Sequence, residues 1–194
     1  GASRSLPSRR PTSLRACLPT RSRLWYSKGM RAAILRGGEL VVDHVPDPVP
    51  GRGQALVKTL ACGICGTDLH MVQNARTLAG STPTEDAPAS IAGPGEIVMG
   101  HEFSAEVVEF GPGSEKRLAV GTQVCSMPIA HTEAGVAAIG FSADYPGGFG
   151  ELMVLSEDLL LEIPNGLSAQ RAALTEPMAV GAHAVAKAGL RKGD

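Results

Sequence analysis

The stretch QALVKTLACGICGTDLH (54–70) joins a strand-like segment to a glycine-containing turn and the start of a helix. Apolar residues dominate its first half, and helical sequence is expected only over 67–73. Two cysteines, Cys62 and Cys65, lie at the junction. Such a pair can be a redox dithiol, half of a structural zinc site or part of a catalytic metal site, so the choice depends on what else the chain offers.

Short apolar segments continue on both sides of this stretch, separated by Gly- and Pro-containing turns. Strands of this length and spacing predict a mainly β fold, a barrel or sandwich, rather than βαβ units. The expected strands, besides 54–62, are 31–36, 39–45, 101–110, 121–128, 151–156 and 159–164. Residues 74–96 are rich in Ala, Gly, Pro, Ser and Thr and predict a long surface loop.

The last thirty residues change character and predict two helices. Ser168 can cap a helix that begins at Ala169. Pro177 cannot continue that helix but suits the first turn of a second one, which we expect to run to about Gly189.

Composition fits one globular domain with an appendage. The 194 residues are 43% hydrophobic and 19% charged, and no apolar run approaches the roughly 18 residues of a membrane span. Residues 1–29 contain seven Arg or Lys and no acid, which leaves 11 basic against 19 acidic residues in the remainder. An acidic body argues against nucleic acid as a partner.

We expect 1–29 to be a disordered basic leader. The chain shows no secretory signal, and we expect a cytoplasmic protein with reduced thiols. The Arg- and Ser-rich composition of the leader keeps a mitochondrial transit peptide as the alternative.

The other cysteines weigh against two of the three interpretations of Cys62 and Cys65. A redox dithiol of the thioredoxin kind should open a helix in a βαβ layer, whereas a β-barrel is expected here. A four-cysteine structural zinc site needs a second pair, and the body of the chain offers only Cys125. A catalytic zinc needs three protein ligands, for which Cys65 and His101 are candidates. They are 36 positions apart, so only the fold can bring them together.

Three motifs in order, GICGTDLH, GHEF and TEPMAVGAHA, resemble the zinc-dependent medium-chain alcohol dehydrogenases. The resemblance covers 30–194 and includes GGFGELMVL (147–155) and IPNGLS (163–168). It implies a GroES-like catalytic β-barrel over 30–167 and connecting helices over 168–194. These helices would lead to a Rossmann nucleotide-binding domain, whose strand, G-x-G-x-x-G turn and helix do not occur in this sequence.

The resemblance also implies a set of site residues. Cys65, His101 and Glu176 would bind zinc, Glu176 taking the place of a later cysteine as in polyol and sugar dehydrogenases. Glu102 would approach the metal, and Asp68 would hold the other ring nitrogen of His101. Thr67 would receive the substrate proton and His70 would release it.

The expected function is therefore zinc-dependent oxidation of an alcohol, polyol or sugar hydroxyl with NAD or NADP. We expect one catalytic zinc, no structural zinc, a small-molecule alcohol as substrate, no membrane partner, and a homo-oligomer for the whole protein. Two alternatives stay open: a zinc-binding GroES-like module without activity of its own, and a metal-free barrel of the co-chaperonin type.

Overall fold

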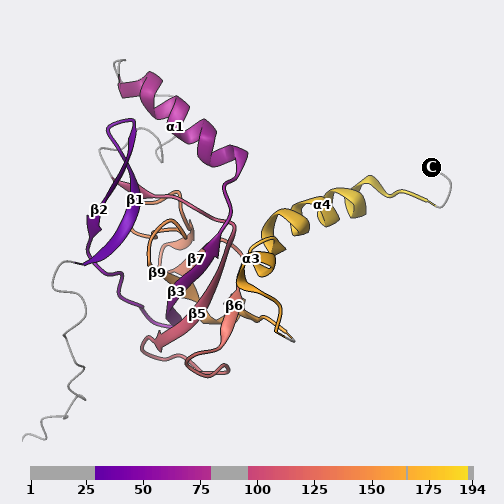
Figure 1. Ribbon diagram of the computed structural model, residues 1–194. Helices are drawn as coiled ribbons and strands as arrows, with labels where there is room; N and C mark the ends of the chain where they lie inside the picture. Colours follow the sequence, from indigo (N-terminus) through magenta and orange to yellow (C-terminus); the bar gives the residue numbers. More distant parts are fainter. Residues whose placement is uncertain (1–28, 80–95, 165, 192–194) are drawn as a thin grey trace, which may run out of the picture.

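A computed structural model describes residues 29–79, 96–164 and 166–191. The fold is mainly β, as predicted, and its strands form two sheets and a separate hairpin (Figure 1). The predicted leader lies almost entirely outside the described residues. No helix within the described ranges is both long and apolar enough to cross a bilayer.

The larger sheet has five strands in the order β10-β6-β5-β3-β9. Its centre is β3 (Gln54–Cys62), which pairs antiparallel with both β5 (Phe103–Phe110) and β9 (Leu152–Ser156). The short strands β6 (Gln123–Cys125) and β10 (Leu161–Glu162) complete it. Alternate inward side chains of the central strands, Val57, Val107, Met153 and Leu155 among them, form the main hydrophobic core.

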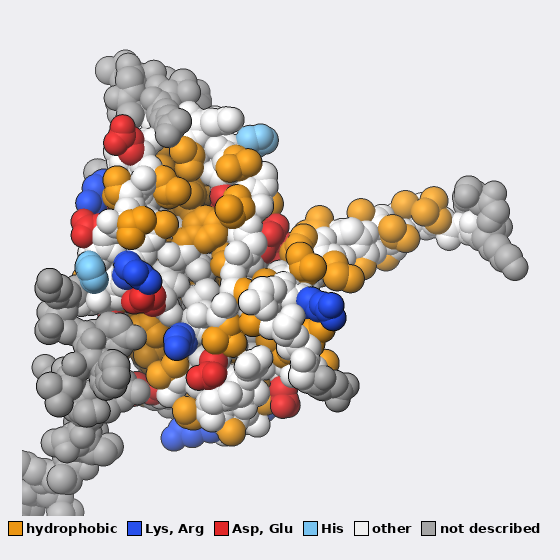
Figure 2. Space-filling view, viewed as in Figure 1, with side chains coloured by type: hydrophobic (Ala, Val, Ile, Leu, Met, Phe, Trp, Pro, Cys, Tyr) orange, Lys and Arg blue, Asp and Glu red, His pale blue; other side chains and the backbone are white. Residues whose placement is uncertain are grey.

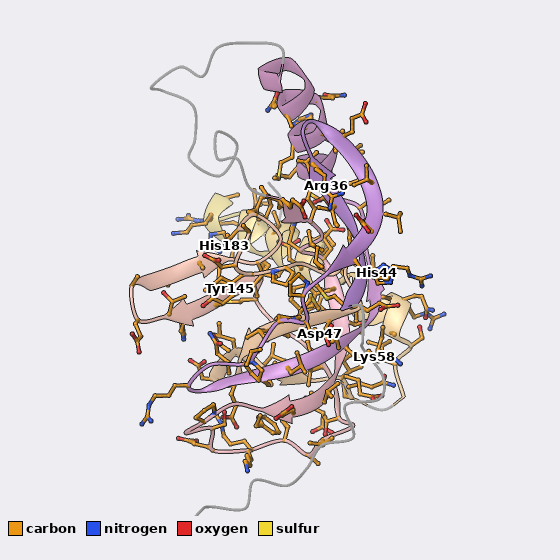
Figure 3. The ribbon with its side chains drawn as sticks, turned by 90° about the vertical axis from the view of Figure 1, so that its left-hand side faces the viewer. Arg36, His44, Asp47, Lys58, Tyr145 and His183 are labelled. Carbon is orange, nitrogen blue, oxygen red and sulfur yellow. The ribbon has the colours of Figure 1, made fainter. Side chains whose placement is uncertain are left out.

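The smaller sheet has three strands in the order β2-β1-β4. They are β1 (Met30–Arg36), β2 (Glu39–Val45) and β4 (Ile97–Val98). Arg36 on β1 forms ion pairs toward both neighbouring strands. Its guanidinium lies 2.9 Å from Asp43 on β2 and 2.7 Å from Glu96 beside β4. Arg36 and His44 can be followed along this sheet in Figure 3.

The helices lie at the periphery of the sheets. Helix α1 (Gly66–Ala79) follows β3, and its Met71 packs against Leu35, Ile97 and Met99. A 3₁₀ turn, η1 (Glu157–Leu159), follows β9, and α3 (Ala169–Ala172) packs on the large sheet, where Ser104 donates a hydrogen bond to the carbonyl of Ala169.

Helix α4 (Thr175–Ala188) stands out from the sheets and buries none of its residues. Figure 2 shows apolar side chains along it. The large exposed ones on and beside the helix are Leu174, Met178, Val180, Val185 and Leu190.

Several element boundaries differ from the sequence-based expectations. Residues 74–79 are helical rather than loop, because α1 extends to Ala79, and residues 80–95 lie outside the described part of the chain. The hairpin of β7 (Ile129–Thr132) and β8 (Gly135–Ala138) was not expected, since its residues lack a strong alternating pattern. Of the strand expected over 159–164, Leu159 belongs to η1 and only Leu161–Glu162 form a strand, β10.

The predicted C-terminal helices form, but one cap differs. Ser168 lies at the N-cap of α3 without a side-chain capping hydrogen bond. Pro177 is in the first turn of α4, which ends at Gly189 in a left-handed conformation with φ 62°. That conformation suits glycine, because no Cβ opposes it.

A buried carboxylate, Glu157, anchors the 114–117 loop to η1. Its oxygens accept backbone N–H groups from Glu115 at 2.8 Å and Arg117 at 3.1 Å. Burial raises the pKa of Glu157, but the N–H donors of Arg117, Glu115 and Lys116 and the hydroxyl of Ser114 outweigh it, so the pKa lies below its ordinary value.

Glu157→Gln should therefore destabilise the fold at neutral pH, by about 1–2 kcal/mol, because the amide is a weaker acceptor for these donors. A carboxyl whose pKa is lowered in the folded state stabilises that state above its unfolded pKa of about 4.3. The difference from wild type should persist from pH 7 to about pH 5 and shrink as the pH falls further. Urea unfolding across pH measures it, with the exposed Glu133→Gln as a control that shows no such trend.

Candidate metal centre

The pairing of β3 with β5 brings the two candidate ligands together. In this antiparallel ladder Cys62, the last residue of β3, lies opposite Phe103, the first residue of β5. Just beyond the paired residues, the N–H of Gly63 donates to the carbonyl of Glu102 at 2.7 Å. Cys65 comes three residues after Cys62 and His101 two residues before Phe103, so their side chains meet although 36 positions separate them.

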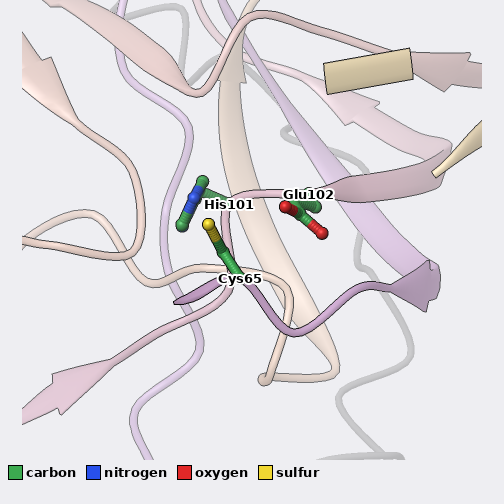
Figure 4. A group of neighbouring side chains, drawn as sticks. All are labelled: Cys65, His101 and Glu102. Atoms are coloured by element: carbon green, nitrogen blue, oxygen red, sulfur yellow. The ribbon is translucent and has the colours of Figure 1, made fainter. Parts of the chain in front are cut away.

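Three donor atoms of different chemistry converge there. The Sγ of Cys65, a ring nitrogen of His101 and a carboxylate oxygen of Glu102 all lie within 4.8 Å of one another (Figure 4). Cys65 and Glu102 are partly buried, and His101 is 7% exposed.

Asp68 connects two members of this group. It is 2% exposed, and its Oδ2 accepts the backbone N–H of Cys65 at 2.9 Å. Its Oδ1 lies 3.6 Å from Nδ1 of His101, which is an ion-pair distance but longer than a hydrogen bond. Neither of these two buried atoms has a hydrogen-bond partner among the described residues. The Asp68 carboxylate therefore faces the His101 imidazole and also accepts a hydrogen bond from the backbone N–H of Cys65.

These observations fit a zinc ion. Zinc binds thiolate, imidazole and carboxylate at about 2.0–2.3 Å, so donors within 4.8 Å of one another can share one ion after small side-chain adjustments. A histidine ligand usually has its second nitrogen paired with a carboxylate. Here Asp68 stands beside Nδ1 of His101, which leaves Nε2 available to a metal.

The residues predicted to move the proton lie on α1. The thiol of Cys65 donates a hydrogen bond to the hydroxyl of Thr67, with 3.5 Å between Sγ and Oγ1. His70 is one turn further along the helix and exposed to solvent. Thr67 is therefore in contact with Cys65, and both Thr67 and His70 are exposed to solvent.

Glu176 is not a member of the group of Cys65, His101 and Glu102. It is partly exposed in the first turn of α4, which stands away from the sheets. The structure thus brings Glu102, rather than Glu176, beside the thiol and the imidazole. The reason is geometric: Glu102 is the neighbour of His101 in sequence, whereas Glu176 depends on how α4 is placed.

Cys62 has a different environment from Cys65. It packs against the main core, and burial, followed by the charge of Asp68, raises the pKa of its thiol to about 12. A thiol with this pKa stays protonated near neutral pH, so Cys62 is a neutral packing residue beside the group. Both cysteines are free thiols.

The family model described as "Alcohol dehydrogenase GroES-like domain" matches residues 51–165, which is more than half of the chain. This chain belongs to that family. The resemblance and the GroES-like fold predicted from its motifs are thereby confirmed.

Its relatives include several dehydrogenases. The (R,R)-butanediol dehydrogenase of Bacillus subtilis is 35% identical over 164 residues, which cover 80% of this chain and 46% of that protein. Sorbitol dehydrogenase of Halalkalibacterium halodurans is 32% identical over 170 residues, which cover 81% of this chain and 45% of that protein. The chain thus spans about half the length of the curated relatives it matches.

Solved structures agree with the fold. The crystal structure of 2R,3R-butanediol dehydrogenase from Bacillus subtilis matches with a TM-score of 0.65 and 34% identity, covering 86% of this GroES-like chain and 49% of the other. A protein from Sinorhizobium meliloti described as a zinc-binding dehydrogenase, solved with NADP, matches with a TM-score of 0.62 and 30% identity, covering 80% and 44%.

Sequence reasoning missed one neighbour of the site. The ring of Phe141 lies against His101, with 4.9 Å between ring centroids and a tilt of 38°. Phe141 follows the unexpected β7–β8 hairpin, 40 positions after His101, and a single phenylalanine in a loop carries no signal of such a contact.

The close packing of Gly148 against Cys62 can be tested. A Cβ at residue 148 would lie 2.7 Å from Sγ and 2.9 Å from Cβ of Cys62. Gly148→Ala should therefore lower the free energy of unfolding by about 1–3 kcal/mol through overpacking. The same change at Gly181 meets no atom within 4 Å and should stabilise α4 slightly. Urea unfolding of both variants makes the comparison; equal stability would contradict the packing described here.

Proposed function

We propose that this chain is the zinc-binding catalytic part of an NAD(P)-dependent dehydrogenase that oxidises an alcohol, polyol or sugar hydroxyl. The observation that carries the proposal is the convergence of Cys65, His101 and Glu102 within 4.8 Å in a member of the alcohol dehydrogenase GroES-like family. Thiolate, imidazole and carboxylate are each zinc ligands, and three protein ligands with one open position are typical of a catalytic zinc.

In this proposal each residue has one task. Cys65 and His101 bind the metal, and Asp68 orients the His101 ring through Nδ1. Glu102 is the third donor in the arrangement described, and Glu176 stays a predicted ligand that a movement of α4 would have to bring in. Zinc would supply Lewis-acid polarisation of the substrate hydroxyl, which makes its proton easier to remove.

Oxidation of an alcohol to a carbonyl compound transfers a hydride from carbon to NAD(P)⁺ and releases a proton from oxygen. The hydroxyl of Thr67, in contact with the Cys65 sulfur, would accept that proton as it gives up its own. His70 would pass it to solvent, because it lies one turn further along α1 and its side chain is exposed.

The relatives suggest the class of substrate. They are named for butanediol, sorbitol, L-galactonate and L-threonine, all of which carry secondary hydroxyl groups with a polar neighbour. We propose a small molecule of this kind, with the nicotinamide held by a part of the protein other than the residues described. A homo-oligomer, a cytoplasmic location and a single zinc per chain belong to the same proposal.

Metal binding tests the ligand set directly. Purified protein should contain about one zinc per chain, and Cys65→Ala should lose it, because a catalytic site needs all its protein ligands. The matched Cys62→Ala should keep its zinc, since that thiol is a packing residue. Metal analysis after dialysis measures both. A wild type that binds no zinc would leave the metal-free, co-chaperonin type barrel as the better interpretation.

The role of Thr67 can be separated from metal binding. Thr67→Val should reduce kcat for alcohol oxidation about 100-fold or more, because the proton acceptor is lost, and should leave the zinc content unchanged. Thr67→Ser, which keeps the hydroxyl, should retain most of the rate. The assay follows NADH or NADPH formation in a protein that joins this region to its nicotinamide-binding part. No activity in that protein despite bound zinc would favour a zinc-binding module without catalysis.

A further inference from the structure

The contact between Phe141 and His101 is built by two glycine–aromatic dipeptides. Gly100 precedes His101 and Gly140 precedes Phe141, and both glycines have positive φ, 97° and 81°. A Cβ on Gly140 would lie 3.2 Å from both the nitrogen and the oxygen of Gly100. The two backbones thus touch at the glycines, and the aromatic side chains that follow them lie against each other.

The loop that carries Phe141 is fixed to the segment before His101 by backbone hydrogen bonds. Gly147 donates to Val98 at 2.8 Å, Gly148 to Gly100 at 2.7 Å and Phe149 to Met99 at 3.0 Å. The loop also closes on itself, because Gly140 donates to the carbonyl of Tyr145 at 3.0 Å. Phe141 is therefore held at a defined place over His101 by backbone contacts on both sides.

The Phe141 side chain is anchored at the other end as well. It packs against the cluster of Leu35, Met71, Ile97 and Met99, which joins the small sheet to α1. The same helix begins with the residues that contact the metal group, Thr67 and Asp68. A shift of α1 would therefore change the support of Phe141 and the position of Asp68 together.

The imidazole ring of His101 is thus in contact with other side chains on two sides. Asp68 faces the edge of the imidazole at Nδ1, and Phe141 covers its face. We propose that Phe141 is a positioning residue, which holds the His101 ring so that its Nε2 points toward the shared donor position with Cys65. The inference rests on the proposed function, and it adds a residue that none of the sequence motifs contains.

Loss of the ring should weaken metal binding without removing a ligand. An aromatic pair of this geometry predicts an effect of about 3- to 10-fold on zinc affinity, below the roughly 10- to 100-fold of a residue that orients a ligand by a hydrogen bond. Phe141→Leu and Phe141→Met keep an apolar side chain in the cluster but remove the ring. Phe141→Tyr keeps the ring and should bind zinc as the wild type does.

The test uses the whole chain and measures zinc dissociation constants by competition with a chelator. Cobalt(II) substitution gives a second readout, because its absorption bands report the geometry around the ion. The Leu and Met variants should show weaker binding and shifted bands, and Tyr should restore both. Phe110→Leu is the matched control: Phe110 is also partly buried against a core cluster, but it lies at the far end of β5.

The outcomes separate the two proposals. If wild type binds zinc through Cys65, and both ring-less variants bind it with unchanged affinity and spectrum, the positioning role is wrong and the metal site stands. If wild type binds no zinc, both are wrong. If Phe110→Leu weakens binding as much as Phe141→Leu, the effect is one of general stability, and the inference is overturned.

Discussion

The antiparallel register of β3 against β5 is the constraint on which the site depends. Pairing of Cys62 with Phe103 places the end of one strand beside the beginning of the other. The segments that leave the ladder there carry Cys65 on one side and His101 with Glu102 on the other. Because side chains alternate along strands, a shift of one residue would turn the side chains of the ladder to the opposite face and separate the donors.

The buried carboxylate of Asp68 adds the second link. Asp68 accepts a hydrogen bond from the backbone N–H of Cys65, and its other oxygen faces His101. It therefore connects the start of α1 to the segment before β5. Burying a carboxylate is unfavourable unless it is paired. A metal held by Nε2 of His101 would strengthen that pairing, because it would make the N–H at Nδ1 a better donor. With the proposed zinc bound, folding and metal binding would therefore be coupled through the side chain of Asp68.

The loop after the β7–β8 hairpin shows how close backbone contacts serve the site. Gly100, Gly140 and Gly148 lie where a Cβ would meet neighbouring atoms within 3.2 Å. Their small size lets the loop lie directly on the segment that carries His101. As a result, Phe141 and Cys62 both pack beside the donors, one against the ring and the other in the adjoining core.

The sequence by itself determined the type of fold and the identity of the main donors. Apolar segments bounded by glycine and proline were sufficient to predict most of the strands, and the order of three motifs was sufficient to predict the family. Gly189 marked the end of α4 because a left-handed residue there favours glycine. The strand segments and the helix end are local properties, because they depend on residues close together in sequence.

Only the tertiary structure decided which donors meet. Glu102 rather than Glu176 lies beside Cys65 and His101, the β7–β8 hairpin forms from weakly patterned residues, and Phe141 covers the imidazole. Each of these depends on strand register, on backbones in contact or on the placement of a helix. Cys65 is 36 and 37 positions from His101 and Glu102, and Phe141 is 40 positions from His101, so no local pattern in the chain shows these contacts. The hairpin is local, but its residues lack a strong alternating pattern.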